Sequence, residues 1–313
     1  MLTKFLYSMN PMEVMMALNR FVPSLRMVIT SNCNGKCKFC HHEGYLEQGD
    51  MSVSLASDIA KAARKLNIPC ICITGGEPTL HPQLFEIISE IQRIGIYDIA
   101  LTTNGCNLLE LSDKVEKSIQ KLNVSITSFD PIINQKYQDV EVDKVKNAIL
   151  KFPSDNKNFN VVINSDNYEK LDEIISFCEL NSIDLDLLFE MNENNELDFS
   201  VEKQVVKKIE SLGQPIIIPG CPSHLTINTQ KGVTIRIKHP KISALLKRNI
   251  CENCNNSTNC LEKVCSVRVY PDGGVSPCLS RYYYFNQSNV EENIFNAYQL
   301  FEQDENLLQS LFY

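Results

Sequence analysis

Short apolar runs alternate with longer segments of helical period between residues 25 and 190. The short runs have the length of strands and are rich in β-branched residues, whereas the longer segments repeat apolar positions every three or four residues. The segment 83–94, for example, places its leucine and isoleucines on one face and stops at Gly95, a residue that commonly ends helices. We therefore expect strands, each followed by a helix, over residues 25–30, 70–74, 99–103, 122–128, 159–164 and 185–190.

Strands that are apolar on both faces and alternate with helices indicate a parallel sheet covered by helices. Six such units are too few for a closed barrel of eight, so we expect an α/β fold with a partial (β/α)6 TIM-like barrel over residues 23–212. Residues 1–22 are interpreted as an amphipathic helical extension and not as a signal peptide, because Pro11, Glu13 and Asn19 interrupt the apolar run and no small-residue cleavage site follows. A change of organisation after the sixth strand indicates a small cysteine-rich C-terminal domain over residues 213–313.

Composition narrows the class of protein. The chain has 313 residues, 43% of them hydrophobic, which is ample for a buried core. A net charge of −8 and the absence of a long basic run disfavour a nucleic-acid partner. No run approaches the roughly 18 apolar residues of a membrane span, so we expect a cytoplasmic protein without a membrane partner.

The thirteen cysteines are unevenly distributed. Three lie within the segment "SNCNGKCKFCHHEG", as Cys33, Cys37 and Cys40, and five more lie between Cys251 and Cys278. A long chain with a good core does not need disulfides for stability. Two clusters of cysteines in a reducing compartment therefore suggest metal.

The first cluster offers three thiolates from one loop. A structural zinc site takes four ligands, and a closed 4Fe-4S cluster takes four thiolates. Three thiolates leave one iron open to a small chelating ligand, which is the arrangement that radical chemistry with S-adenosylmethionine (SAM) requires. Zinc with His41 or His42 as the fourth ligand is the alternative.

Two further segments follow strands. "GGEP" (75–78) follows the second strand; its glycines let a backbone edge approach a ligand, and Glu77 offers an acceptor for an ammonium group. "TTNG" (102–105) ends the third strand. Because parallel strands end on the same rim, we expect both segments to lie beside the cysteine loop.

These segments resemble the radical SAM enzymes, whose C-x3-C-x-aromatic-C motif is matched by Cys33, Cys37, Phe39 and Cys40. The resemblance extends to the GTP cyclases that make the molybdenum-cofactor precursor, over roughly residues 24–190. Its successive segments are "LRMVITSNCNGKCKFCHHEG", "ITGGEPTLHP", "IALTTNGCNLLEL" and "LNVSITSFDP".

The resemblance implies a role for each matching residue. It places a 4Fe-4S cluster on Cys33, Cys37 and Cys40. It places the methionine end of SAM against Gly75, Gly76, Glu77 and Pro78. It assigns the ribose and carboxylate of SAM to Thr102, Asn104 and Ser125, the alternative being polar residues that are satisfied locally. The implied reaction is cleavage of SAM by an electron from an external one-electron reductant, giving a 5′-deoxyadenosyl radical that abstracts a hydrogen atom.

The second group of cysteines comprises Cys251, Cys254, Cys260, Cys265 and Cys278. A C-x2-C pair followed by further cysteines indicates zinc or a second iron-sulfur cluster. The segment "VRVYPDGGVSPCL" resembles the auxiliary-cluster region of the GTP cyclase and of peptide-modifying radical enzymes. Five cysteines suffice for one auxiliary 4Fe-4S cluster and not for two, and which of them are ligands stays open.

The substrate is less well indicated. Arg26 and Arg268 match basic residues of the cyclase, and guanidinium groups suit phosphate or carboxylate. Other expected basic residues are missing, and Ser266 stands where an arginine is expected. We expect a cyclase-like enzyme acting on a small anionic molecule, a nucleotide included. The alternatives are a maturase that modifies a ribosomal peptide and a non-catalytic iron-sulfur or zinc protein.

Overall fold

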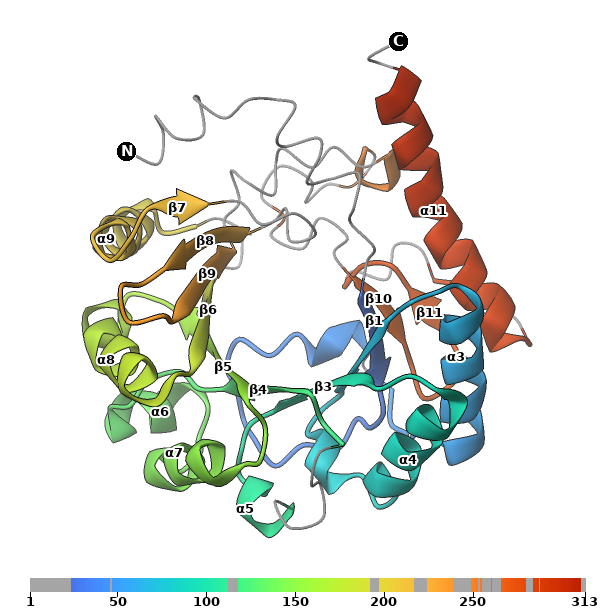
Figure 1. Ribbon diagram of the computed structural model, residues 1–313, viewed down its shortest axis with the longest axis horizontal. Coiled ribbons are helices and arrows are strands. Elements are labelled where there is room, and N and C mark those ends of the chain that lie inside the picture. Colours follow the sequence, from blue (N-terminus) through green and yellow to red (C-terminus); the bar gives the residue numbers. More distant parts are fainter. Residues whose placement is uncertain are drawn as a thin grey trace. The chain divides into compact units, whose positions relative to one another are not determined.

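The computed structural model has two compact units (Figure 1). The site unit holds the described residues from 24 to 159 and from 266 to 302, and the second unit holds those from 160 to 260 and from 303 onward. The residues that the structure describes are 24–45, 47–111, 118–191, 197–216, 224–238, 249–252, 254, 260, 266–279, 284–286 and 288–310.

The site unit is a sheet with helices packed against it. Its strands run in the order β11-β10-β1-β2-β3-β4, all parallel except β11, which pairs antiparallel with β10. The strands are β1 (Ser24–Val28), β2 (Cys70–Thr74), β3 (Asp98–Thr103), β4 (Lys121–Ser125), β10 (Ser266–Val269) and β11 (Val275–Ser276). The helices are α3 (Val53–Lys65), α4 (Leu84–Ile94), α5 (Leu108–Leu111), α6 (Pro131–Tyr137) and α7 (Val142–Lys151), with short 3-10 turns η1 (His42–Gly44) and η2 (Pro78–Leu80). Helix α11 (Val290–Ser310) begins in this unit, and the division between the units falls inside it, after residue 302.

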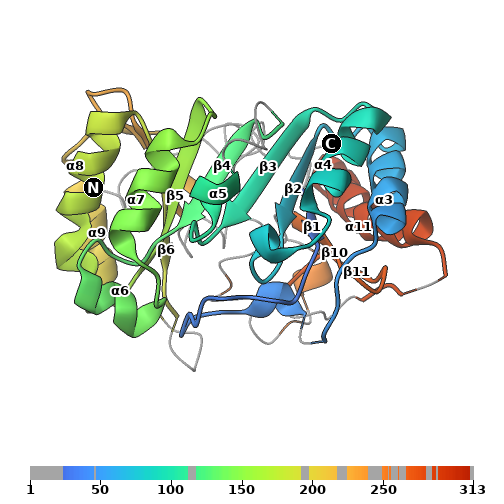
Figure 2. The ribbon, with the colours of Figure 1, turned by 90° about the horizontal axis from the view of Figure 1, so that it is seen from below.

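The two faces of this sheet differ because successive side chains of a strand point to opposite sides. Leu25 and Met27 of β1 are fully buried on one face, as are their neighbours in β2, β3 and β10. Helices α3 and α4 lie side by side on the outer side of these strands (Figures 1 and 2). The other face carries Arg26, which is level with Arg268 of β10 and Cys72 of β2. Polar chemistry is therefore confined to one face.

Local sequence fixes where the helices of this unit begin and end. The Ser52 hydroxyl accepts a hydrogen bond from the Leu55 N–H at 3.2 Å and caps the start of α3. Helix α4 ends, as expected, at Gly95, whose φ of 98° lies in the left-handed region that glycine tolerates. These boundaries set the lengths of the loops that connect the helices to the strands.

The second unit holds strands in the order β6-β9-β8-β7. Strand β9 runs parallel to β6, whereas β8 is antiparallel to both β9 and β7. Its strands are β6 (Asp184–Phe189), β7 (Pro215–Ile216), β8 (His224–Asn228) and β9 (Thr234–Lys238), and the division between the units falls inside β5 (Asn156–Ile163). Its helices are α8 (Leu171–Asn181) and α9 (Phe199–Glu210), with 3-10 turns η3 (Tyr168–Lys170) and η4 (Asn249–Cys251).

The expected α/β fold class is confirmed, since successive parallel strands are separated by helices. All six expected strands form, the second over the same residues 70–74 and the others within a few residues of the expected bounds. Strands β7, β8, β9, β10 and β11 were not expected. The expected helical extension lies outside the described residues, and the domain boundaries at 212 and 213 stay a prediction. None of the described helices is long and apolar enough to cross a membrane.

Candidate active site

The three-cysteine loop leaves the carboxyl end of β1. Cys33 and Cys40 are exposed and Cys37 is half-buried, as is Phe39 between them. The Gly35 N–H donates to Sγ of Cys33 at 3.3 Å, and the His42 N–H donates to Sγ of Cys40 at 3.4 Å. Hydrogen bonds to sulfur stabilise a thiolate and tune iron-sulfur clusters. The loop thus presents the donor set that such a cluster uses.

The three thiols also lie within electrostatic reach of one another. Burial, followed by the neighbouring Cys40 and Cys33, raises the pKa of Cys37 to about 12, and burial likewise raises the pKa of Cys33. A cationic iron site would offset the repulsion between these thiolates. Within the described residues, no three His, Cys, Asp or Glu side chains already stand in metal-binding geometry. The chemistry of the three thiols and their spacing along the chain are therefore what suit this loop to an iron-sulfur cluster.

The GGEP segment packs directly against the start of the cysteine loop. The Gly76 N–H donates to the Thr30 carbonyl and the Glu77 N–H to the Asn32 carbonyl, both at 2.7 Å. A Cβ on Gly76 would lie 2.3 Å from the Asn32 carbonyl oxygen, and one on Gly75 would lie 2.5 Å from that of Thr30. The glycines are thus required by the approach of two backbones. Their contact with SAM stays a prediction.

Glu77 ties the ends of two strands together from a buried position, with 1% of its surface exposed. Its carboxylate accepts hydrogen bonds from the Thr103 hydroxyl at 2.7 Å, the Asn104 N–H at 2.7 Å and the Thr79 N–H at 3.1 Å. Burial raises the pKa of Glu77, and these hydrogen bonds act in the opposite direction. Pro78 follows as the buried first residue of η2. The expected role of Glu77 as an ammonium acceptor stays a prediction.

The other expected SAM residues lie on the same rim. Asn104 is buried, and its Nδ2 donates to Oδ1 of Asn34 in the cysteine loop at 2.7 Å. Thr102 is half-buried, with its hydroxyl 3.5 Å from the sulfur of Cys72. Ser125 ends β4, and its carbonyl accepts from Nε2 of Gln138 at 2.8 Å. The structure therefore brings TTNG to the cysteine loop, as expected.

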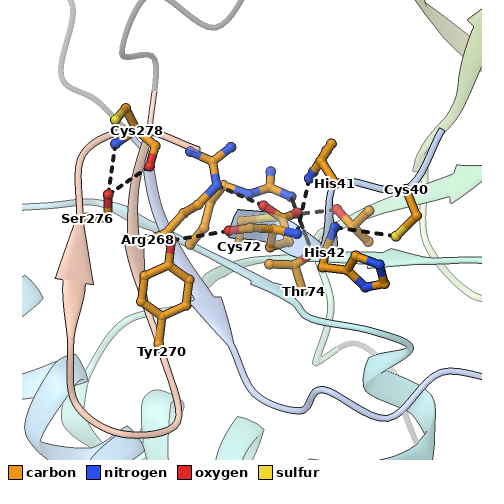
Figure 3. Close-up of polar contacts among 12 residues, drawn as sticks. Cys40, His41, His42, Cys72, Thr74, Arg268, Tyr270, Ser276 and Cys278 are labelled. Atoms are coloured by element: carbon orange, nitrogen blue, oxygen red, sulfur yellow. Dashed lines mark hydrogen bonds and ion pairs between the residues drawn. The ribbon is translucent and has the colours of Figure 1, made fainter. Parts of the chain in front are cut away.

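Arg26 and Arg268 meet at one carboxylate, that of Glu43. Nη2 of Arg26 lies 2.5 Å from Oε1, and Nε of Arg268 donates to Oε2 at 2.8 Å. The Thr74 hydroxyl also donates to Oε1, at 2.9 Å, and the Tyr270 hydroxyl donates to the Glu43 carbonyl at 3.1 Å. Figure 3 shows Arg268, Thr74 and Tyr270 converging beside the segment that holds Cys40 and His41.

Glu43 is charged in this setting. Burial by itself would raise the pKa of Glu43, but Arg26, Arg268 and His41 together hold that pKa well below its usual range. The sequence analysis did not single out Glu43. The signal was its place in "CHHEG", three residues after the third cysteine. The pairing of β1 with β10 had to be known before both arginines could be assigned to it.

The second group of cysteines falls in both units. Cys251, Cys254 and Cys260 are half-buried in the second unit, whereas Cys278 follows β11 in the site unit. The Cys278 N–H donates to the Ser276 hydroxyl at 3.3 Å. Cys265 lies outside the described residues. The auxiliary cluster therefore stays a prediction.

Comparison with known proteins decides the family. Residues 27–178 match the family described as the Radical SAM superfamily. A relative from Sulfurisphaera tokodaii, named "Probable GTP 3',8-cyclase", is 32% identical over 280 residues, which cover 84% of this chain and 82% of the relative. The chain belongs to the radical SAM superfamily.

Other similarities agree with this membership. A protein of Sulfolobus acidocaldarius with the same name is 34% identical to this radical SAM protein over 180 residues, or 55% of this chain and 57% of that one. Among solved structures, Streptococcus suis SuiB bound to precursor peptide SuiA matches with a TM-score of 0.64 at 16% identity. That match covers 89% of this chain but 65% of SuiB, and it shows the fold alone.

Membership in the radical SAM superfamily implies a 4Fe-4S cluster and SAM. The residues present fit both groups. The chain offers three thiols in one loop, N–H groups that already donate to two of the sulfurs, and a glycine-lined backbone edge beside them. Cys33, Cys37 and Cys40 would hold the cluster.

Proposed function

We propose that this chain is an enzyme that cleaves SAM reductively and uses the product to abstract a hydrogen atom from a small anionic substrate. When bound, the cluster and SAM supply a 5′-deoxyadenosyl radical for that abstraction. The observation that carries the proposal is the attachment of the three-cysteine loop to GGEP and TTNG through Gly76, Glu77 and Asn104. These contacts fix the residues expected to bind both cofactors on one rim.

The chain's own residues would position the reactants. The backbone of 75–78 would hold the methionine end of SAM, while Thr102, Asn104 and Ser125 would line its ribose and carboxylate. The buried Glu77 would hold the segment after GGEP and the TTNG segment together, because its carboxylate accepts hydrogen bonds from the N–H groups of Thr79 and Asn104. A site held rigidly in this way would keep the reacting groups in a fixed relative geometry.

Two observations support a small anionic substrate of the cyclase type, nucleotides included. Arg26 and Arg268 lie together on the face of the sheet that carries the site. The Sulfurisphaera tokodaii and Sulfolobus acidocaldarius relatives are named as GTP cyclases. Against GTP itself, the position of a further expected arginine is taken by the buried Ser266.

A peptide-modifying maturase is the second candidate. It is favoured by the fold likeness to SuiB, which was solved with its precursor peptide SuiA, and by the extra C-terminal cysteines. A precursor peptide encoded beside this chain that is altered only in the presence of SAM would favour it. A non-catalytic iron-sulfur or zinc protein is the third candidate, and the intact triplet and GGEP segment count against it.

The proposal includes further components. One auxiliary 4Fe-4S cluster would use cysteines from among Cys251, Cys254, Cys260, Cys265 and Cys278. An external one-electron reductant would supply the electron. The cytoplasm is the fitting compartment, because reduced thiols and oxygen-sensitive clusters persist there.

The deciding experiment measures 5′-deoxyadenosine released by anaerobically reconstituted, reduced protein with SAM, with and without GTP. Stimulation by GTP together with a cyclised nucleotide would establish the cyclase reaction. Slow cleavage that ignores GTP would keep the enzyme class and point to another substrate. Cys37→Ser should abolish the product, and product formation that persists in this variant would refute the cluster assignment.

A further inference from the structure

We propose that Glu43 is a positioning residue, which holds Arg26 and Arg268 together as one anion-binding pair beside the cluster loop. The inference rests on the proposed function, since it names the group that prepares the site for an anionic substrate. None of the motifs in the sequence analysis pointed to Glu43 as a functional residue.

Arg26 and Arg268 project from neighbouring strands of the sheet. Arg26 and Arg268 are level with each other on neighbouring parallel strands, so their side chains leave the same face. Adjacent parallel strands lie about 4.8 Å apart. Two guanidinium groups at this spacing repel each other, and like charges directly opposite are unfavourable in sheets. The arrangement needs an anion between them.

Glu43 supplies that anion in a fixed geometry. Its two oxygens are divided, with Oε1 taking Nη2 of Arg26 at 2.5 Å and Oε2 taking Nε of Arg268 at 2.8 Å. Each guanidinium has five N–H donors in a rigid plane. A contact at one nitrogen therefore restricts the directions in which the remaining donors can point.

Glu43 is itself held from several sides. Its side chain is 8% exposed, and Thr74 of β2 donates to Oε1 while Tyr270 donates to its carbonyl. The Glu43 N–H donates to Nδ1 of His41 at 3.0 Å. Its φ of 52° lies in the left-handed region that non-glycine residues rarely adopt, and residues are held there only when their surroundings over-determine them.

The same contacts join the arginine pair to the cluster loop. Glu43 follows Cys40 by three residues, and the His42 N–H between them donates to the Cys40 sulfur (Figure 3). The position of the anion-binding pair and the end of the cluster loop are thus set by one side chain. An anion on the arginines would lie at a defined place relative to the cofactor site.

The test measures how fast phenylglyoxal modifies each arginine of the reconstituted full chain, read by peptide mass spectrometry. In Glu43→Gln the charge is lost and the shape is kept. Arg26 and Arg268 should then react about tenfold faster, the factor expected for a lost charge-assisted hydrogen bond. Arg64 and Arg236, which contact other partners, should be unchanged.

Glu90→Gln is the matched control, because Glu90 pairs with Arg93 on α4. It should speed modification of Arg93 and leave Arg26 and Arg268 as they were. Unchanged rates at Arg26 and Arg268 in Glu43→Gln would overturn the proposal. So would an equal increase at every arginine, which would mean that the fold had loosened as a whole.

Inorganic pyrophosphate serves as the anion probe in the same assay. It should protect Arg26 and Arg268 in the wild-type chain, and Glu43→Gln should need about ten times more of it for equal protection. Absence of protection in the wild-type chain would overturn the anion-binding pair. SAM cleavage by the wild-type chain is measured separately, so that a failure of the proposed function is distinguishable from a failure of this inference.

Discussion

Glu43 keeps its charge in a buried position because two guanidinium groups offset the cost of removing a carboxylate from water. A carboxyl group whose pKa is lowered by folding stabilises the folded state at every pH above its unfolded pKa. That contribution is lost as the pH falls through the lowered, folded pKa. The arginine pair thus makes part of the stability of the site unit sensitive to acid.

Glu43→Gln should lower the free energy of unfolding by about 3 kcal/mol at pH 7, because it leaves the buried Arg268 and the half-buried Arg26 without their anion. The difference between the variant and the wild type should stay constant from pH 7 down to the ordinary glutamate value of 4.5. It should shrink below that value. Urea unfolding of the metal-free chains between pH 7 and pH 3.5 measures this, and a constant difference over the whole range would contradict the assignment.

Gly76→Ala tests the contact between GGEP and the cysteine loop. The new Cβ would lie 2.3 Å from the Asn32 carbonyl oxygen, so one backbone must move. We expect a loss of about 2 kcal/mol or more of stability and less iron per chain after reconstitution. Gly49→Ala is the control, since its Cβ would meet Pro271 at 3.5 Å and the Tyr45 hydroxyl at 3.9 Å, both ordinary contacts. Equal iron content in the two variants would count against the contact.

For single residues, the sequence predicted the cysteines that would carry the chemistry, but it did not predict the residues that hold the site in place. Spacing alone placed Cys33, Cys37 and Cys40 in one loop, since they are close along the chain. Glu43 was out of reach, because its partner Arg268 lies 225 residues away and only strand pairing brings them together. A second reason for a glycine at position 76 was not foreseen, since the backbone of Asn32 lies where a Cβ would stand.

Among the elements, α6 supports the cluster loop from one side. The Lys36 N–H donates to the Gln138 carbonyl at 3.3 Å and the Lys38 N–H to the Tyr137 carbonyl at 2.9 Å. Asp130 caps the start of α6, accepting from the Ile132 N–H at 2.9 Å. The position of the cysteine loop therefore depends on this short helix being folded.

Asp130→Ala should cost about 1 kcal/mol through the lost cap and should also lower the yield of cluster. Asp198→Ala makes the same change at the start of α9 in the second unit, where Asp198 accepts from the Ser200 N–H at 2.9 Å. It should cost a similar amount of stability and leave the cluster yield unchanged. Thermal unfolding and iron analysis of both variants measure the two effects, and matching cluster yields would contradict the role of α6.

The prediction of strands succeeded where a run was almost wholly apolar. Strand β2 was predicted over its observed residues, because "CICIT" is buried on both sides of a parallel sheet. Strands β8 and β9 were not expected, since "HLTIN" and "TIRIK" mix polar with apolar positions. Their pairing depends on each other and on β6, which no local pattern reveals.

For the molecule as a whole, the expected barrel domain of residues 23–212 can be tested as a separate chain. Such a chain lacks β10, whose Val267 and Val269 are fully buried beside β1. We expect it to lose cooperative thermal unfolding, measured by circular dichroism, because β1 would become an edge strand. A chain ending at residue 302 keeps β10 and should unfold cooperatively. A sharp transition in the shorter chain would support the expected boundary instead.

The pairing of β1 with β10 also has a consequence for biosynthesis. The arginine that completes the Glu43 contact is made 225 residues after Glu43 itself, or about 10 to 45 seconds later at about 5 to 20 residues per second. During that interval the cysteine loop emerges from the ribosome without the strand that anchors its far end. Iron delivered in that interval would meet thiols on an incomplete scaffold, so we expect productive loading of the cluster to follow the synthesis of β10.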